Sequence, residues 1–162
     1  MTERLNKIFS IRGLFVFYWA MLWLMNGLDK FLNRKNLSFF TWFGKDRTEQ
    51  FSEYFDKVAL PDAWIEPLLI GTGIWELLVA LPFILVFGAL VFRGYFDEAK
   101  FRIGMFLGGV TFTGFCFFDI IFGDRAELLE HSTFLVLIGV TYVIVMSGRD
   151  YVGDSRDPLS VR

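Results

Sequence analysis

Four long stretches of the chain lack the regular polar positions of a water-facing helix. They cover roughly residues 11–31, 67–92, 101–122 and 127–146. Each is long enough to cross the hydrocarbon core of a bilayer, which takes about 20 apolar residues in helical form. The pattern therefore predicts an all-α membrane protein whose four transmembrane helices pack as one bundle.

The segment between the first two stretches, residues 32–66, contains an amphipathic pattern of its own. Apolar positions recur there at the spacing of one helical face and are Phe51, Tyr54, Phe55 and Val58. Asp46 and Glu49 precede them at capping-box spacing, and Pro61 is expected to end the helix. The segment from about 46 to 58 is thus predicted to be an interfacial helix.

Aromatic side chains flank this predicted helix. They are Phe39, Phe40, Trp42, Phe43 and Trp64. Because aromatic residues gather where membrane and water meet, we expect them in the aromatic belt of the bilayer. A loop that rests on the membrane surface without binding a ligand is the simplest interpretation.

The composition agrees with a membrane protein. Hydrophobic residues make up 54% of the chain and aromatic residues 19%, including 21 Phe, and the mean hydropathy is +0.47. Such values are typical of chains that contact lipid over much of their surface. The lipid bilayer is therefore the first expected partner. No basic patch indicates a nucleic-acid partner.

Lys and Arg are distributed unequally in the short segments around the four stretches. One side of the membrane would carry Arg4, Lys7, Arg12, Arg93, Lys100, Arg102, Arg149, Arg156 and Arg162, and the other Arg125 together with the mixed charges of the long first loop. Cations near span ends stay on the cytoplasmic side, and long loops count less. We therefore expect residues 1–147 to form a transmembrane domain with both termini cytoplasmic. The loop 32–66 would be extracytoplasmic, and residues 148–162 would form a cytoplasmic tail.

Each predicted span contains polar residues near the same end. At about 1.5 Å per residue from the cytoplasmic ends, Lys30 lies about 28 Å deep, Glu76 about 24 Å, Asp119 about 27 Å and His131 about 22 Å. Ionised groups in lipid are costly and should pair inside the bundle. We expect Lys30 to pair with Glu76. Asp119 and the His131 ring could then close a polar network beneath the outer surface.

These residues allow two interpretations. They could form a structural lock, meaning a set of ion pairs that holds the helices together, or they could bind a ligand or relay protons. The candidates for binding or proton relay are Lys30, Glu76, Asp119, Glu130 and His131, and those for apolar pocket walls are Trp19, Trp23 and Trp75. In the third stretch, Gly104-x-x-x-Gly108 would let another helix approach closely.

Several chemistries are excluded by residue counts. Cys116 is the only cysteine, so this chain alone has no disulfide, no Cys-x-x-Cys redox pair and no ligand set for an iron–sulfur cluster. His131 is the only histidine, which excludes bis-histidine haem ligation by this chain and makes zinc a poor fit. We therefore predict no metal and no covalent cofactor.

Two short motifs carry a resemblance to a known family. NGLDKF at 26–31 and GTGIWELLVALPF at 71–83, together with the four-span layout, resemble the DoxX family of small membrane proteins. The resemblance matches Lys30 to the family's basic residue on the first helix and Glu76 to its carboxylate on the second. It implies residence in the bacterial cytoplasmic (inner) membrane. It also implies roles that range from the membrane subunit of a thiosulfate:quinone oxidoreductase to stress defence, sulfur metabolism and assembly of partner membrane proteins.

Three functions follow from these observations. The chain is an accessory or assembly subunit of a larger membrane complex, respiratory or of another redox type. Alternatively, it is a membrane subunit that binds a quinone, a lipid or another apolar small molecule. The third option is a small transporter, which is less favoured because no inverted repeat or broken helix is legible. The lack of a self-sufficient redox group favours the first option and predicts other membrane subunits as partners.

The predicted topology can be tested with cysteines introduced at the two termini of a Cys116→Ser chain. In intact cells, a membrane-impermeant maleimide should label neither terminus until the membrane is permeabilised, because both should face the cytoplasm. Labelling of one terminus in intact cells would contradict a chain that crosses the membrane four times.

Overall fold

The computed structural model describes residues 8–147, and its long helices match the four apolar stretches. The predicted tail at 148–162 and the basic residues Arg4 and Lys7 lie outside the described residues. The long helices are α2 (Ile11–Leu32), α4 (Ile65–Arg93), α5 (Glu98–Phe122) and α6 (Arg125–Ser147). Two short elements, α3 (Thr48–Lys57) and the 3₁₀ helix η1 (Asp62–Trp64), lie between α2 and α4. The predicted all-α fold is confirmed, with four helices long and apolar enough to cross a membrane.

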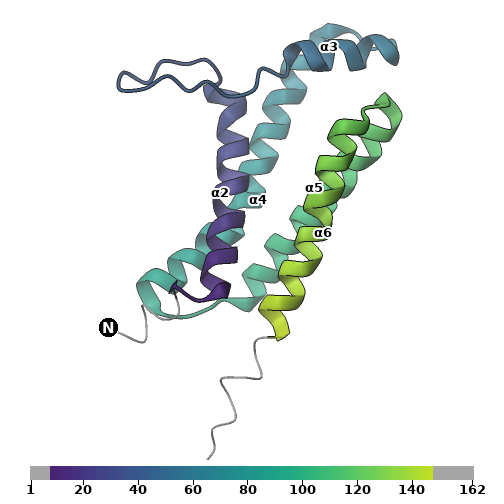
Figure 1. The fold of residues 1–162 in the computed structure, drawn as a ribbon. Helices are drawn as coiled ribbons and strands as arrows, with labels where there is room; N and C mark the ends of the chain where they lie inside the picture. Colours follow the sequence, from purple (N-terminus) through teal and green to yellow (C-terminus); the bar gives the residue numbers. More distant parts are fainter. Residues whose placement is uncertain (1–7, 148–162) are drawn as a thin grey trace, which may run out of the picture.

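The four long helices run up and down as two adjacent pairs (Figure 1). α2 packs most extensively against α4, and α5 against α6, while α4 and α5 connect the two pairs. Gly94 after α4 and Gly123 after α5 adopt left-handed backbone conformations, with φ of 63° and 73°. Glycine tolerates this conformation, which ends a helix and lets the chain reverse within a few residues. The loop between α2 and α4 and the turn after α5 therefore lie at one end of the bundle, called here the loop end.

The interior of the bundle is filled by large side chains. Trp19, Trp23, Phe83 and Phe101 are at most 2% exposed. A Cβ atom on Gly104 would lie 2.8 Å from the Phe83 ring, closer than side-chain atoms pack. One on Gly108 would lie 3.1 Å from Ile138 and 3.3 Å from the Trp23 ring. The glycines of the Gly104-x-x-x-Gly108 motif therefore face other helices of the bundle, and the space that they leave is filled by the Phe83, Ile138 and Trp23 side chains.

α3 lies across the loop end of the bundle, roughly perpendicular to the long helices (Figure 1). Tyr54 and Phe55 are buried in a second apolar cluster with Ile65, against which Phe51, Leu69 and Phe122 pack. The predicted face of this helix is therefore the face that contacts the bundle, except for Val58. Val58 is 37% exposed, because it follows the last turn as the C-terminal cap.

The predicted capping box at Asp46 and Glu49 is wrong. The residue that caps α3 is Arg47, whose side chain makes no capping hydrogen bond. Asp46 instead accepts a hydrogen bond from the Thr48 backbone N–H, at 3.0 Å, in a turn that precedes the helix. Pro61 does not end α3, since the helix stops at Lys57 and Pro61 caps η1.

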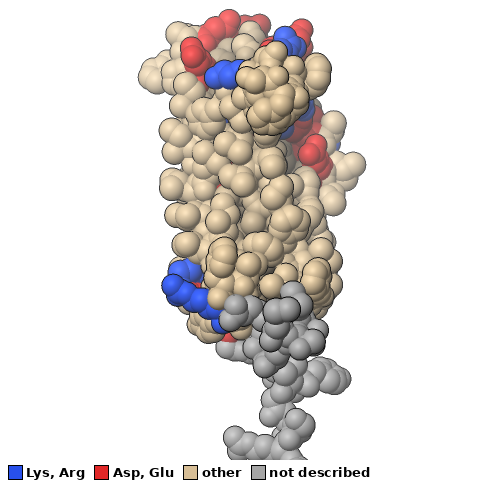
Figure 2. Space-filling view, turned by 90° about the vertical axis from the view of Figure 1, so that its left-hand side faces the viewer, with Lys and Arg blue, Asp and Glu red and all other residues tan. Residues whose placement is uncertain are grey.

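A tall uncharged band separates the charged ends of the molecule (Figure 2). Large apolar side chains are exposed along all four long helices, among them Leu14, Leu78, Phe106 and Val143. The shortest of these helices, α2, has 22 residues, which gives it a length of about 33 Å. This length matches the hydrocarbon core of a bilayer, and lipid contact accounts for the exposed apolar surface.

Candidate functional site

A buried ion pair joins α2 to α4 near the loop end. Lys30 Nζ lies 2.8 Å from Glu76 Oε1 and 2.7 Å from Oε2, and the two side chains are 9% and 4% exposed. Gly73, nearly one turn before Glu76, makes room for the pair, since a Cβ atom there would lie 3.1 Å from Lys30 Cβ. The ammonium also donates to the Asn26 carbonyl at 3.4 Å. The predicted pairing of Lys30 with Glu76 is confirmed.

A second polar pair joins α5 to α6. His131 Nδ1 lies 2.7 Å from Asp119 Oδ2, and the Asp119 residue is 5% exposed. The rings of Phe115 and Phe112 lie beside the imidazole, with centroids 5.0 and 6.1 Å away. The predicted contact between Asp119 and His131 is confirmed. Each helix pair of the bundle thus has a polar contact of its own near the loop end.

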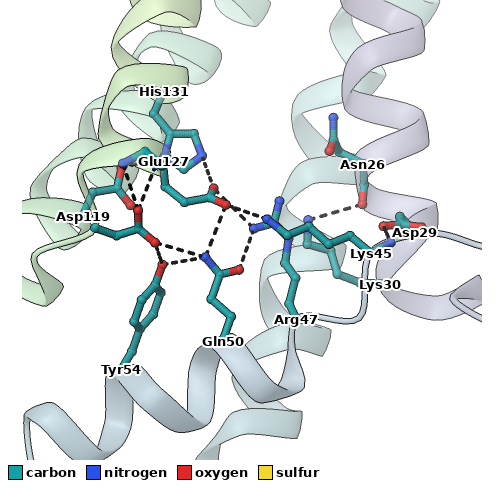
Figure 3. A network of polar contacts seen from close by, with 12 residues as sticks. Asn26, Asp29, Lys30, Lys45, Arg47, Gln50, Tyr54, Asp119, Glu127 and His131 are labelled. Carbon is teal, nitrogen blue, oxygen red and sulfur yellow. Dashed lines mark hydrogen bonds and ion pairs between the residues drawn. The ribbon is translucent and has the colours of Figure 1, made fainter.

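Glu127, in the first turn of α6, connects the first loop to this second pair (Figure 3). Its carboxylate lies 2.6 Å from Lys45 Nζ, 3.3 Å from Gln50 Nε2 and 3.5 Å from Arg47 Nη1. His131 Nε2 is 3.8 Å away on the other side. Glu127 is 7% exposed, so these groups replace the water that an ionised carboxylate would otherwise bind.

The Tyr54 hydroxyl binds α3 to the turn between α5 and α6. It donates a 2.6 Å hydrogen bond to Asp124 Oδ2, and its ring stacks on Phe122 with centroids 4.6 Å apart. Asp124 Oδ1 accepts hydrogen bonds from the backbone N–H groups of Ala126 and Glu127, which caps α6. The Tyr54 hydroxyl and the Glu127 N–H hold the pKa of Asp124 below its usual value. Burial, followed by the hydrogen bond to Asp124, raises the pKa of Tyr54. Donor and acceptor therefore keep their roles at neutral pH.

Asp29 attaches the same loop to α2. Its Oδ1 accepts a 2.6 Å hydrogen bond from Trp42 Nε1, and its Oδ2 accepts one of 3.0 Å from the Lys45 backbone N–H. Lys45 therefore binds α2 through its backbone and Glu127 of α6 through its side chain. The loop connects the two helix pairs at the loop end, where α2 and α6 make few direct contacts.

A small polar cavity of about 70 Å³ lies between the Lys30–Glu76 pair and the loop. Its lining residues are Asp29, Lys30, Asn33, Lys45, Asp46, Arg47, Thr48 and Leu69. This size and lining suit a few water molecules. The loop side of the buried pair is therefore polar.

The other residues singled out from the sequence lie elsewhere. Glu130 is exposed and takes no part in the polar contacts described above. Trp19 and Trp23 belong to the packed core, and Trp19 Nε1 donates to Thr141 Oγ1 at 3.3 Å. Trp75 is 40% exposed and donates to Thr111 Oγ1 at 2.8 Å. The two indole hydrogen bonds connect α2 with α6 and α4 with α5.

Most residues of this polar network were not among the candidates chosen from the sequence. They are Asp29, Trp42, Lys45, Arg47, Gln50, Tyr54, Asp124 and Glu127. One signal was available, because Glu127 precedes His131 by four residues and so shares its helical face. The loop residues gave no such signal, since their positions depend on how an irregular segment folds back on the bundle.

The arrangement holds the loop on the bundle and places His131 between two carboxylates, 2.7 Å from Asp119 and 3.8 Å from Glu127. The longer of these distances is not a hydrogen bond. Within residues 8–147, no group of three or more His, Cys, Asp and Glu side chains is placed to hold a metal ion. Comparison of the chain with models of protein families, with curated proteins and with solved structures gave no match. The resemblance to the DoxX family therefore stays a prediction.

The Lys30–Glu76 pair can be tested by a double-mutant cycle of thermal stability in detergent. Glu76→Gln and Lys30→Met should each destabilise the bundle by roughly 3–5 kcal/mol, because each strands a buried charge. The double variant should recover part of the loss. Arg102→Gln, which breaks the more exposed pair of Arg102 with Glu98, is the control and should have a much smaller effect. Additive losses from the two single changes would contradict the coupling.

Proposed function

We propose that the chain is a non-catalytic accessory or assembly subunit of a larger membrane complex, respiratory or of another redox type. The observation that supports this most is that the buried carboxylates of the bundle all have partners within the chain. Glu76 binds Lys30, Asp119 binds His131, and Glu127 binds the cations of the first loop. Side chains paired in this way hold helices and loop together.

The lateral surface of the bundle offers a place for a partner. A shallow apolar groove of about 380 Å³ lies between α5 and α6 and is lined by Phe106, Gly109, Val110, Thr113 and Leu135. A Cβ atom on Gly109 would meet nothing within 4 Å, so the α5 backbone is open to an approaching helix. The hydroxyl of Thr113, which lines the groove, already has a hydrogen-bond acceptor in the Gly109 carbonyl. The occupant we propose is a transmembrane helix of another subunit, since a groove at this depth admits apolar, internally hydrogen-bonded segments.

The membrane and the orientation are part of the same proposal. We infer that the protein lies in the bacterial cytoplasmic membrane with both termini on the cytoplasmic side. Arg12, Arg93, Lys100 and Arg102 support this orientation, because all four lie at the end of the bundle opposite the loop (Figure 2). Membership of the DoxX family is also proposed here. Its support is the contact between Lys30 and Glu76, the two residues that the resemblance matches to family positions.

A quinone-binding subunit of the thiosulfate:quinone oxidoreductase type is the second candidate. The observation that favours it is the Trp23 indole N–H, which is buried in the core without a hydrogen-bond acceptor. A quinone carbonyl could accept that hydrogen bond if the helix pairs separated slightly. The ring of Phe112, which packs on both Trp23 and His131, lies between this donor and the polar cluster.

Substitution within the groove tests the accessory role. The chain and its variants would be purified from the native membrane in mild detergent, and the co-purifying proteins and lipid-soluble molecules identified. Gly109→Leu should fill the groove and remove a co-purifying membrane protein without lowering the thermal stability of the isolated chain. Gly114→Leu is the matched control, because a Cβ at Gly114 also meets nothing within 4 Å and this residue does not line the groove.

Two outcomes would contradict the accessory role through this groove. If Gly109→Leu retains the same membrane protein as the unmodified chain, the groove is not the partner's site. If a quinone co-purifies in place of a protein, and Trp23→Phe removes it, the second candidate replaces the first.

A further inference from the structure

Residues 34–45, called here the aromatic hairpin, form a small ordered loop at the end of α2. The Leu37 N–H donates to the Phe40 carbonyl at 2.9 Å, and the Trp42 N–H donates to the Lys35 carbonyl at 3.0 Å. Between them, Asn36 and Thr41 form an antiparallel bridge. The base of the hairpin is held on α2 by the two hydrogen bonds to Asp29. The segment is therefore a fixed projection of the bundle.

The hairpin presents aromatic rings to its surroundings instead of burying them. Phe39 is 86% exposed, Phe43 80% and Phe40 46%. Phe39 and Phe40 contact each other, with ring centroids 5.0 Å apart, and Phe40 lies 6.4 Å from Trp42. This apolar surface is large for a loop, and no other part of residues 8–147 covers it.

The direction of the hairpin indicates what covers it. Figure 1 shows it projecting sideways from the end of α2, away from α5 and α6 and roughly perpendicular to the long helices. Its first residue, Arg34, comes two positions after Leu32, the last residue of a helix that is long and apolar enough to span the membrane. A sideways projection from that level lies along the surface of the bilayer.

The charged side chains of the hairpin are all cations, which suit a negatively charged lipid surface. Between residues 34 and 45 the cations are Arg34, Lys35 and Lys45, and there is no Asp or Glu. Lys45 forms an ion pair with Glu127, and Arg34 lies 3.6 Å from Asp46 in a largely exposed pair. Lys35 is exposed and belongs to the same hairpin as the aromatic rings. Aromatic rings with neighbouring cations and no acid suit the boundary between acyl chains and anionic headgroups.

We propose that the aromatic hairpin is an interfacial anchor that inserts Phe39 and Phe43 into the headgroup layer of the bilayer and selects anionic phospholipid through Lys35. Because the hairpin is hydrogen-bonded to Asp29, this anchor fixes the depth of the loop end of α2. Asp29 is the sequence neighbour of Lys30, so the same contact sets the depth of the Lys30–Glu76 pair. The inference does not depend on the accessory role proposed above.

The test uses the whole chain in lipid nanodiscs, with a fluorophore on a cysteine introduced at Ser38 in a Cys116→Ala background. Ser38 is exposed next to Phe39, so the label reports the hairpin without removing a ring. Spin-labelled phosphatidylglycerol and phosphatidylcholine, labelled near the headgroup, are used as quenchers. The same label at Glu53, on the exposed face of α3, is the control for a site in water.

The anchor predicts strong quenching at Ser38 and weak quenching at Glu53, with phosphatidylglycerol the better quencher at Ser38. Phe39→Ser with Phe43→Ser should abolish the difference between the two label positions. Lys35→Gln should reduce the preference for phosphatidylglycerol about fivefold, as expected for one cation near an anionic surface. Arg125→Gln, which removes an exposed cation elsewhere at the loop end, should leave that preference unchanged.

Equal, weak quenching at Ser38 and Glu53 would show that the hairpin stands in water and would overturn the anchor. Equal quenching of Ser38 by the two lipids would overturn the selectivity for anionic lipid. Protection of the Ser38 label by a co-purified protein, and not by lipid, would overturn the assignment of lipid as the occupant.

Discussion

An ionised side chain inside an apolar helix must find a partner at its own depth, and this requirement determines the loop end of the molecule. Lys30 and Glu76 meet it for α2 and α4, and Asp119 and His131 meet it for α5 and α6. Glu127 lies 3.8 Å from His131 in its own helix pair, and the cations nearest to its carboxylate, Lys45 and Arg47, come from the first loop. The path of that loop is therefore coupled to the charge of one buried carboxylate.

The sequence predicts the parts of this arrangement that follow from periodicity and depth. Four apolar stretches locate the spans, and counting residues from their ends brings Lys30 to Glu76 and Asp119 to His131. Both pairings need only that the helices be straight and antiparallel. The face of α3 follows in the same way from the spacing of Phe51, Tyr54 and Phe55.

Contacts made by irregular backbone are not predictable by these means. Lys45, Arg47 and Trp42 reach their partners because the loop turns back on Asp29, and no local pattern encodes that turn. The start of α3 shows the same limit, since Asp46 has the spacing of a capping residue but accepts a hydrogen bond from Thr48, one residue before the Glu49 N–H that a capping box would use. Glu130 was the candidate chosen from the sequence, but the carboxylate found in the site is Glu127. Helical phase is the reason, because Glu127 shares a face with His131 whereas Glu130 is exposed.

Because the buried carboxylates pair with groups of the chain itself, the remaining surface is free for other contacts. The lateral face is apolar with an open groove at Gly109, and the aromatic hairpin projects sideways from the end of α2. The accessory role proposed above relies on these two features, a rigid interior and a lateral surface with room for a partner helix. In this account, the ion pairs supply the rigidity.

The central claim is that Glu127 holds the loop and α3 on the bundle, and hydrogen exchange of residues 48–57 in lipid nanodiscs tests it most directly. Glu127→Ala should accelerate exchange in this segment, because Lys45, Arg47 and Gln50 lose their common acceptor. Glu130→Ala removes the same side chain from an exposed position on the same helix and should leave exchange there unchanged. Equal exchange in the two variants would contradict the account, since α3 would then be held by its apolar face alone.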